Sequence, residues 1–352
     1  MASAEQPPYG RILLTRMKFI GDVVLTTPLI RSVRTAYPDA FIAYMGDRQA
    51  ISLLESNPSL NELIPFDFSR PTAVEQPRVA WTLRRRRFDL AIDLFGNPRS
   101  ALLTWLSGAA VRVGPDRKGR GRLYTIRVRD DGRPKSAIAF HNQYLTAAGI
   151  PVTAQATEIF LSDAERREAR IYLRWVTEGK EGTAGGRPVI AFLPGATWPA
   201  KRWLPERFAA LADMAVARLG ARAVVIGGPD DGPAVDALLQ SVVAPVDRLP
   251  VLPLRQLAGV LSHCAAVVAN DAGPMHISAA LGIPTIGIFG PGEENIWFPY
   301  DAALGHRALR KDVPCHPCHL DFCNREGEGY MECMKRLTVD EAFTALASVL
   351  KR

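Results

Sequence analysis

The sequence predicts an α/β protein made of two Rossmann-like domains. Short apolar runs alternate with helix-length segments along the 352 residues, a pattern typical of parallel βαβ units. The alternation stops at a polar, glycine-rich stretch, residues 179–187, and then begins again. The length also fits two domains better than one. We therefore expect two doubly wound domains that face a central cleft.

The first half, residues 1–178, begins with an apolar strand at 11–16. A Lys-Phe-Ile-Gly-Asp turn and a helix through Tyr37 follow it. Further segments repeat the pattern, with strands at 41–45, 63–66 and 89–95 and a helix at 73–87.

The second half, residues 188–335, follows the predicted linker at 179–187 and repeats the same order. Its predicted strands are 189–193, 223–226, 266–269 and 285–289, and its predicted helices are 206–219, 254–263 and 275–281. The C-terminal segment, 336–352, contains a last helix at 339–350 that could pack back on the N-terminal domain.

Charge and hydropathy limit the function classes. The 43 Lys and Arg residues exceed the 36 Asp and Glu residues by seven, which suits an anionic partner such as nucleic acid, a membrane surface or a phosphorylated small molecule. No apolar stretch is long enough to span a membrane, and the polar N-terminus does not resemble a secretory signal. We expect a cytoplasmic protein whose five cysteines are reduced or bind metal.

Three common nucleotide or hydrolase motifs are absent from the sequence. There is no GxGxxG fingerprint, no Walker motif and no GxSxG elbow. Hydride transfer, P-loop phosphoryl transfer and serine hydrolysis are therefore disfavoured.

Asp22 follows Gly21 where the first strand turns into a helix. In open α/β sheets this edge faces the ligand. Asp22 could simply cap the helix, which is the favoured local interpretation. Alternatively it is a general base at the floor of the cleft, with Arg16 and Lys18 near an acceptor.

A second turn, residues 270–276 (NDAGPMH), joins a strand to a helix. Gly273 permits close approach of a ligand, and Pro274 suits a first helical turn whose free amides bind anions. Asp271 could be a plain cap and His276 a core histidine, but the combination favours a diphosphate site.

Two further turns leave strands at the same edge. Residues 194–205 combine a glycine, the Thr197 hydroxyl and the cations Lys201 and Arg202, which suits a diphosphate. The turn 227–232 carries Asp230 and Asp231, which could accept from ribose hydroxyls or simply form a tight turn.

Together these segments resemble the ADP-heptose:lipopolysaccharide heptosyltransferases of glycosyltransferase family 9. The resemblance is carried by RMKFIGDVVLTTPLIRSVR, LPGATWPAKRWLPERF and, most specifically, NDAGPMHISAALGIPTIGIFGP. It covers nearly the whole chain.

The resemblance implies a GT-B fold, with the acceptor on the N-terminal domain and the nucleotide-sugar on the C-terminal domain. It implies inverting transfer of heptose from ADP-L-glycero-β-D-manno-heptose to the inner core of lipopolysaccharide. Asp22 corresponds to the catalytic carboxylate. The donor contacts it implies are Thr197, Lys201, Asp271, Ala272, Gly273 and His276, with Asp230 or Asp231 at the ribose or adenine. Ala272 replaces the hydroxyl residue that several members carry.

This assignment is chemically consistent. Inverting transfer needs one base for the acceptor hydroxyl and positive charge at the leaving diphosphate. Lys201 and the amides after Asp271 can supply that charge, so we expect no catalytic metal and no required cofactor.

Arginines are clustered in the first half. Arg84–Arg87 form one run, and a loop holds the others, Arg112, Arg117, Lys118, Arg120 and Arg122. They could form only a solvated surface. The implied acceptor is an anionic glycolipid, so we assign Arg16, Lys18, Arg112, Lys118 and Arg120 to acceptor binding. The same charge predicts attachment to the cytoplasmic face of the inner membrane. We expect no nucleic-acid partner, because the basic segments lack interleaved aromatic residues and no nucleic-acid-binding module is recognised.

Four cysteines, Cys315, Cys318, Cys323 and Cys333, lie close together in the sequence. They could hold a structural zinc, form redox pairs or remain reduced thiols. We expect a structural role away from the reaction in each case.

Two other interpretations stay open. The protein could use another nucleotide-sugar or acceptor, or it could be a non-catalytic binder of anionic glycans. A pure binder would not need Asp22.

Overall fold

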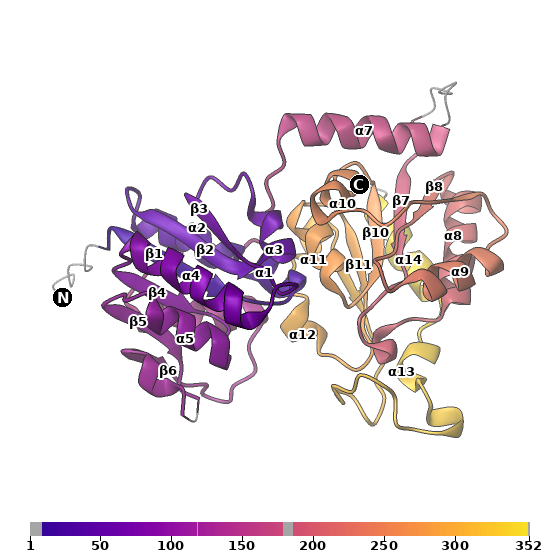
Figure 1. Cartoon of the computed structure of the whole chain (residues 1–352). Coiled ribbons are helices and arrows are strands. Elements are labelled where there is room, and N and C mark those ends of the chain that lie inside the picture. The colour runs from indigo at the N-terminus through magenta and orange to yellow at the C-terminus, as the bar shows by residue number, and fades with distance from the viewer. Residues whose placement is uncertain (1–8, 118, 179–185, 351–352) are drawn as a thin grey trace. The chain divides into compact units, whose positions relative to one another are not determined.

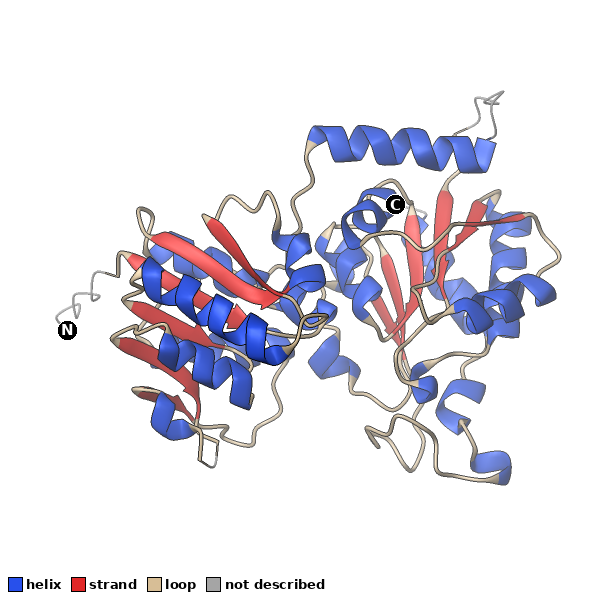
Figure 2. Ribbon diagram, in the orientation of Figure 1, coloured by secondary structure: helices blue, strands red, loops and turns tan. Residues whose placement is uncertain are grey.

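The chain divides into two compact units, Met1–Phe160 and Leu161–Arg352. The structure is a computed structural model that describes residues 9–117, 119–178 and 186–350. Figure 1 shows a parallel sheet flanked by helices in each unit, and Figure 2 shows the same elements by type. The predicted α/β class and the two Rossmann-like domains are confirmed.

The first unit contains a six-stranded parallel sheet in the order β3-β2-β1-β4-β5-β6. Its strands are β1 (Arg11–Arg16), β2 (Phe41–Asp47), β3 (Glu62–Phe66), β4 (Leu90–Asp93), β5 (Val111–Pro115) and β6 (Ile126–Val128). The sequence predicted the first four but not β5 and β6.

Helices cover both faces of this sheet, because consecutive side chains of the central strand β1 are apolar and point alternately to the two faces. Ile12 and Leu14 join the core under α2 and α6, while Leu13 joins a second core under α4 and α5. The helices are α1 (Ile20–Leu25), α2 (Thr27–Ala36), α3 (Arg48–Ile51), α4 (Thr72–Arg86), α5 (Pro98–Leu106) and α6 (Ala137–Ala147).

The second unit repeats this topology. Its sheet has the order β12-β11-β10-β7-β8-β9, which is the first unit's order read from the opposite side. The strands are β7 (Val189–Leu193), β8 (Arg222–Val225), β9 (Val246–Arg248), β10 (Ala266–Asn270), β11 (Thr285–Ile288) and β12 (Arg307–Leu309).

Trp203 is fully buried at the centre of the second unit's largest core cluster, with residues of α8 and α14 around it. The helices are α7 (Asp163–Glu178), α8 (Pro205–Leu219), α9 (Gly232–Ser241), α10 (Leu254–Leu261), α11 (Gly273–Ala280), α12 (Glu294–Trp297), α13 (Glu332–Lys335) and α14 (Val339–Leu350).

The unit boundary lies earlier than the sequence analysis placed it. Helix α7 packs against α10 and so belongs to the second unit rather than to a domain ending at residue 178. The last helix, α14, packs on α8, β10 and β11, which makes it part of the second unit's core and corrects the expectation that it packs on the N-terminal domain. Most of the predicted linker, residues 179–185, lies outside the described residues.

Because all strands of each sheet are parallel, their carboxyl ends share one edge. In each sheet the strand order reverses beside the first strand, between β1 and β4 and between β7 and β10. Open α/β sheets bind ligands outside the carboxyl ends at such a switch point. Among the described residues, no helix is both long and apolar enough to cross a bilayer.

Replacing Leu346 of α14 by Ala should lower the free energy of unfolding of the second unit by about 2–5 kcal/mol, because this fully buried side chain leaves a cavity beside the core. Urea unfolding measures the change. Val243→Ala, at a 91% exposed position, is the control and should change stability by less than about 0.5 kcal/mol. An equal effect of the two substitutions would contradict the packing of α14.

Candidate functional site

In the first unit, Asp22 lies directly beyond the carboxyl end of β1 and forms an ion pair with Arg16. Arg16 Nη2 is 2.5 Å from Asp22 Oδ1, and the two side chains are only 12% and 11% exposed. The backbone N–H of Phe19 lies 3.4 Å from the second oxygen, Oδ2. The carboxylate therefore has a fixed orientation and still retains acceptor capacity.

Arg16 is itself held in place from three sides. Its Nη1 donates to the Leu94 carbonyl at 2.8 Å, and its guanidinium stacks on the Phe95 ring at 4.8 Å. The sequence analysis assigned Arg16 to the acceptor. The structure instead places it against Asp22, so its direct contact in this unit is with the candidate base.

A second buried carboxylate, which the sequence analysis missed, lies at the end of β4. Asp93 is fully buried, and it accepts from the Tyr124 hydroxyl at 2.7 Å and from the backbone N–H groups of Phe95 and Gly96 at 3.0 Å. Burial raises its pKa, while these hydrogen bonds oppose that shift. Asp93 shapes the switch point from within rather than facing solvent.

The other residues predicted to bind the acceptor lie in different parts of the first unit. Lys18 Nζ lies 4.3 Å from the centre of the Phe68 ring, and Arg120 follows the carboxyl end of β5. Arg112 lies near the amino end of β5, where it donates to the carbonyls of Leu123 and Ala109 at 2.8 and 2.6 Å. Arg112 therefore supports the β5–β6 loop, and its assignment to the acceptor stays a prediction. Lys118 lies outside the described residues.

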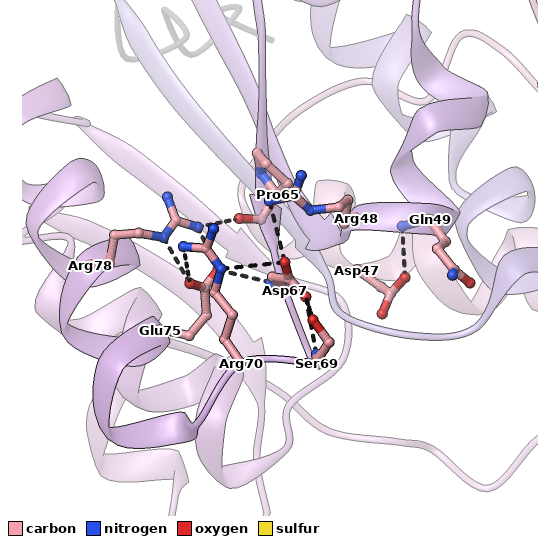
Figure 3. A network of polar contacts seen from close by, with 9 residues as sticks. All are labelled: Asp47, Arg48, Gln49, Pro65, Asp67, Ser69, Arg70, Glu75 and Arg78. Carbon is pink, nitrogen blue, oxygen red and sulfur yellow. Dashed lines mark hydrogen bonds and ion pairs between the residues drawn. The ribbon is translucent and has the colours of Figure 1, made fainter.

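Figure 3 shows a polar network beyond β2 and β3 that the sequence analysis did not identify. Glu75 is fully buried and accepts from Arg78 and from the Asp67 backbone N–H. The hydrogen bonds from Arg78 hold the pKa of Glu75 below its usual range. Asp67 in turn pairs with Arg48 and Arg70, which remain about half exposed. These two arginines are cations available at the carboxyl edge of the first sheet.

In the second unit, the buried amide of Asn270 joins the loop after β7 to the end of β10 at the switch point. Its Nδ2 donates to the Pro194 carbonyl at 2.8 Å, and its Oδ1 accepts from the Trp203 backbone N–H at 3.0 Å. This fixes the turn after β7 against the end of β10. The sequence analysis included Asn270 in its motif but gave it no role.

Lys201 and Asp271 form the central ion pair of this edge. Their Nζ and Oδ2 atoms are 2.6 Å apart, and Asp271 is only 5% exposed. Burial raises the pKa of Asp271, and the Lys201 ammonium acts against that increase. The ammonium also lies 4.6 Å from the centre of the Trp198 ring. A Cβ on Gly292 would come within 2.9 Å of Asp271 Oδ2, so that position accommodates only a glycine without rearrangement.

The first turn of α11 begins beside this pair without a side-chain cap. Its N-cap residue is Ala272, which has no side-chain hydrogen-bonding group, and Gly273 begins the helix. An uncapped helix N-terminus favours an anion. His276, on the same helix, is buried and hydrogen-bonds through Nδ1 to the Tyr300 hydroxyl at 2.6 Å. Burial and the Lys201 charge lower its pKa to about 3, so it is neutral at physiological pH.

The remaining predicted donor residues lie around the same edge. Thr197 and Asp230 are exposed. Asp231 accepts from the Gly228 backbone N–H at 2.8 Å and packs against Gly195. Asp231 therefore holds the β8 turn against the β7 turn, while Asp230 remains open to solvent.

The cysteine-containing segment contacts the candidate donor site, contrary to the expectation that it lies away from it. The Asp321 carbonyl accepts from the Ala200 backbone N–H at 2.9 Å, and His316 Nε2 lies 2.9 Å from the Gly292 carbonyl oxygen. All four thiols are free. Burial raises the pKa of Cys333 to about 11, and the neighbouring sulfurs of the other three cysteines add to that increase. Within the described ranges, no group of three or more His, Cys, Asp or Glu side chains is arranged to hold a metal ion.

The two units are doubly wound α/β domains with ion-paired carboxylates at the carboxyl edges of their sheets. Sequence comparison specifies the family. The sequence profile of glycosyltransferase family 9 (heptosyltransferase) matches residues 77–326. The chain therefore belongs to this family, and the fold is GT-B.

Relatives of known function align over most of the chain. Lipopolysaccharide heptosyltransferase 2 of Escherichia coli (strain K12) is 28% identical over 318 residues, which are 85% of this chain and 86% of that protein. Lipopolysaccharide heptosyltransferase 1 of Pseudomonas aeruginosa is 27% identical over 327 residues, which are 89% and 87% of the two chains.

Solved structures share the fold. A glycosyltransferase family 9 protein from Veillonella parvula superposes with a TM-score of 0.84 at 25% identity and covers 99% of both chains. The structure of Escherichia coli ADP-heptose lps heptosyltransferase II gives a TM-score of 0.78 at 24% identity, covering 97% of this chain and 98% of that one.

The buried neutral histidine gives a pH dependence. The pKa of His276 is about 3 in the fold and 6.5 when unperturbed. Below pH 6.5 the unfolded chain binds a proton that the folded chain does not, so stability falls as the pH falls. At about pH 5.5 the loss from this residue should be about 1.4 kcal/mol relative to neutral pH.

Urea unfolding of the wild type and His276→Gln at neutral pH and at about pH 5.5 measures this loss. The glutamine variant should be less stable at neutral pH and should lose about 1.4 kcal/mol less on acidification. Equal losses in the two proteins would show that His276 is not buried in its neutral form.

Proposed function

We propose that the protein transfers L-glycero-D-manno-heptose from ADP-heptose to the inner core of lipopolysaccharide, with inversion at the anomeric carbon. The observation that carries this proposal is the pairing of Lys201 with Asp271 beside the uncapped N-terminus of α11. Family membership and the names of the curated relatives support the sugar and the acceptor.

The second unit binds the donor in this proposal. The diphosphate lies at the α11 N-terminus, where the backbone N–H groups of Ala272 and Gly273 and the Lys201 ammonium stabilise its charge. Lys201 then shares its ammonium between Asp271 and a phosphate oxygen. Thr197 adds a hydroxyl contact, and exposed Asp230 accepts from the ribose. Neutral His276 supports the helix turn through Tyr300.

The first unit supplies the base. Asp22 accepts the proton of the acceptor hydroxyl as that oxygen attacks the anomeric carbon of heptose. The bond from this carbon to the diphosphate oxygen breaks, and ADP leaves with the electron pair. A single displacement inverts the configuration. Arg16 is a positioning residue that orients the Asp22 carboxylate.

Cations at the carboxyl edge of the first unit bind the anionic acceptor. Lys18 and Arg120 are retained from the sequence analysis, and Arg48 and Arg70 are added because they are half exposed at the same edge. Planar guanidinium groups suit both the carboxylates and the phosphates of an inner core.

No metal takes part in this mechanism, since Lys201 and helix amides compensate the leaving group. A structural zinc on Cys315, Cys318, Cys323 and Cys333 stays a separate proposal, which rests on the close spacing of four free thiols in the sequence and not on their arrangement in the described residues. Metal content of the purified protein tests it. We also propose that the protein associates with the inner membrane, where a lipid-linked acceptor would lie.

Asp22→Asn should lower kcat by about 10³-fold, because the amide cannot accept the proton. The assay follows acceptor-dependent ADP release from ADP-heptose, with heptose-free core, one-heptose core and no acceptor compared. Binding of ADP, which belongs to the second unit, should be unchanged. Asp39→Asn, at an exposed aspartate of the same unit, is the control. Full activity of Asp22→Asn would exclude Asp22 as the base.

Lys201→Met should weaken ADP binding and lower kcat by about 10²-fold or more, because it removes a cation from the diphosphate and leaves Asp271 unpaired. Lys311→Met removes an ion-paired lysine elsewhere in the unit and should preserve both quantities. Calorimetric titration with ADP distinguishes the two variants. Wild-type ADP affinity in Lys201→Met would contradict the donor site, whereas ADP binding without transfer to either acceptor would indicate a different sugar or acceptor.

A further inference from the structure

Helices α4 and α5 lie side by side on one face of the first unit's sheet and carry two exposed tryptophans (Figure 1). Trp81 of α4 is 62% exposed and Trp105 of α5 is 49% exposed. The buried sides of the same helices contribute Val79, Leu83 and Leu103 to the core. The tryptophans are therefore not needed for packing of the sheet.

Trp81 and Trp105 occupy corresponding positions along the two helices. The Arg84 guanidinium lies against Gly108, just beyond the end of α5. Trp81 lies three residues before Arg84, and Trp105 lies three residues before Gly108. Both helices connect parallel strands, so they run in the same direction. Trp81 and Trp105 thus lie about one turn before a shared point of contact.

Unpaired positive charge surrounds the tryptophans. Arg84, Arg85 and Arg87 are exposed and make no ion pair among the described residues. The Arg85 guanidinium lies 4.4 Å from the centre of the Trp81 ring. Arg86, in contrast, is paired with Glu62.

No exposed carboxylate belongs to either helix. Helix α5 has no acidic residue, and the single one in α4, Glu75, is fully buried and paired with Arg78. The exposed charged groups of the helix pair are therefore all cationic.

We propose that this α4–α5 face, defined by Trp81, Arg84, Arg85, Arg87 and Trp105, binds the surface of an anionic phospholipid membrane. Indole rings prefer the boundary between headgroups and acyl chains, and each arginine near an anionic leaflet adds attraction. The proposal rests on the proposed function in one respect, namely that a lipid-linked acceptor gives the enzyme a reason to be at a membrane.

The position of the face suits such an acceptor. Helix α4 begins at Thr72, near the carboxyl edge that carries Asp22, and reaches Trp81 nine residues later. At 1.5 Å per residue this is about 14 Å along the helix. An acceptor sugar that projects from the bilayer by a similar distance could reach that edge.

Helix α7 of the second unit also carries exposed apolar side chains, and it provides the comparison. Its Ile171 and Trp175 are exposed as well, but so are the acidic residues Asp163 and Glu168 on the same helix. Mixed charge fits an anionic surface less well. Two copies of the α4–α5 face would repel each other, which argues against self-association through it.

Co-sedimentation of the full chain with phosphatidylcholine vesicles, with and without phosphatidylglycerol, tests the proposal at low and high salt. The wild type should bind only the anionic vesicles and dissociate at high salt. Arg84→Gln/Arg85→Gln should bind about 25-fold more weakly, about fivefold for each arginine. Trp81→Ala/Trp105→Ala should lose about tenfold. Trp175→Ala on α7 is the matched control and should bind like the wild type.

Transfer to a soluble, deacylated acceptor is measured in parallel and should be unchanged in all three variants. Loss of vesicle binding only in Trp175→Ala, or wild-type binding by both α4–α5 variants, would overturn the proposed face. Binding that depends on protein concentration together with dimers in sedimentation would assign the face to a second copy and overturn it too. Vesicle binding without any transfer would leave the face supported and refute the proposed function instead.

Discussion

The ion pair between Lys201 and Asp271 is the interaction on which the second unit's site depends. Asp271 is nearly inaccessible to solvent, and a buried carboxylate without a partner would be strongly destabilising. Lys201 satisfies that requirement, and in doing so its ammonium is held beside the α11 N-terminus before any substrate binds. Asn270 completes the arrangement, because its amide fixes the loop that carries Lys201 to the strand that carries Asp271. Preorganised charge of this kind stabilises a leaving anion without reorganisation during the reaction.

The first unit also has an ion pair and a buried polar side chain at its switch point, but they are formed by different residues. Its switch point also has a paired carboxylate, Asp22 with Arg16, and a fully buried polar group at the end of the fourth strand, Asp93, where the second unit has Asn270. In the second unit Asn270 fixes the loop after β7 to the end of β10. In the first unit Arg16 makes the corresponding contact by donating to the Leu94 carbonyl, while Asp93 fixes the turn after β4 to Tyr124. The two units differ in the sign of the charged group that could contact a substrate. The first unit keeps a carboxylate oriented by an arginine, and the second keeps an ammonium oriented by a carboxylate.

Much of this was predictable from the sequence, because apolar runs and strand-to-helix turns are local signals. The strands near 11–16, 189–193 and 266–269 and the loops that carry Asp22, Lys201 and Asp271 were identified in this way. Short edge strands such as β6 lack such a signal. The backbone contacts of Arg112 were not predictable, because counting charges does not reveal which backbone carbonyls a guanidinium will reach. Helix α7 was placed in the wrong unit since its partner, α10, is distant in sequence. The roles of Asn270 and Asp93, and the contact of the cysteine segment with Ala200, likewise depend on tertiary packing.

The stereochemistry of the product is the sharpest test of Asp22 as the base. In the proposed mechanism one oriented carboxylate acts as a base and Lys201 stabilises the diphosphate, so that the sugar would be transferred in a single displacement. Starting from the β-configured ADP-heptose, NMR spectroscopy of the purified product should show one added heptose in an α linkage. A β linkage would require an intermediate on a second nucleophile, and it would contradict the role assigned to Asp22.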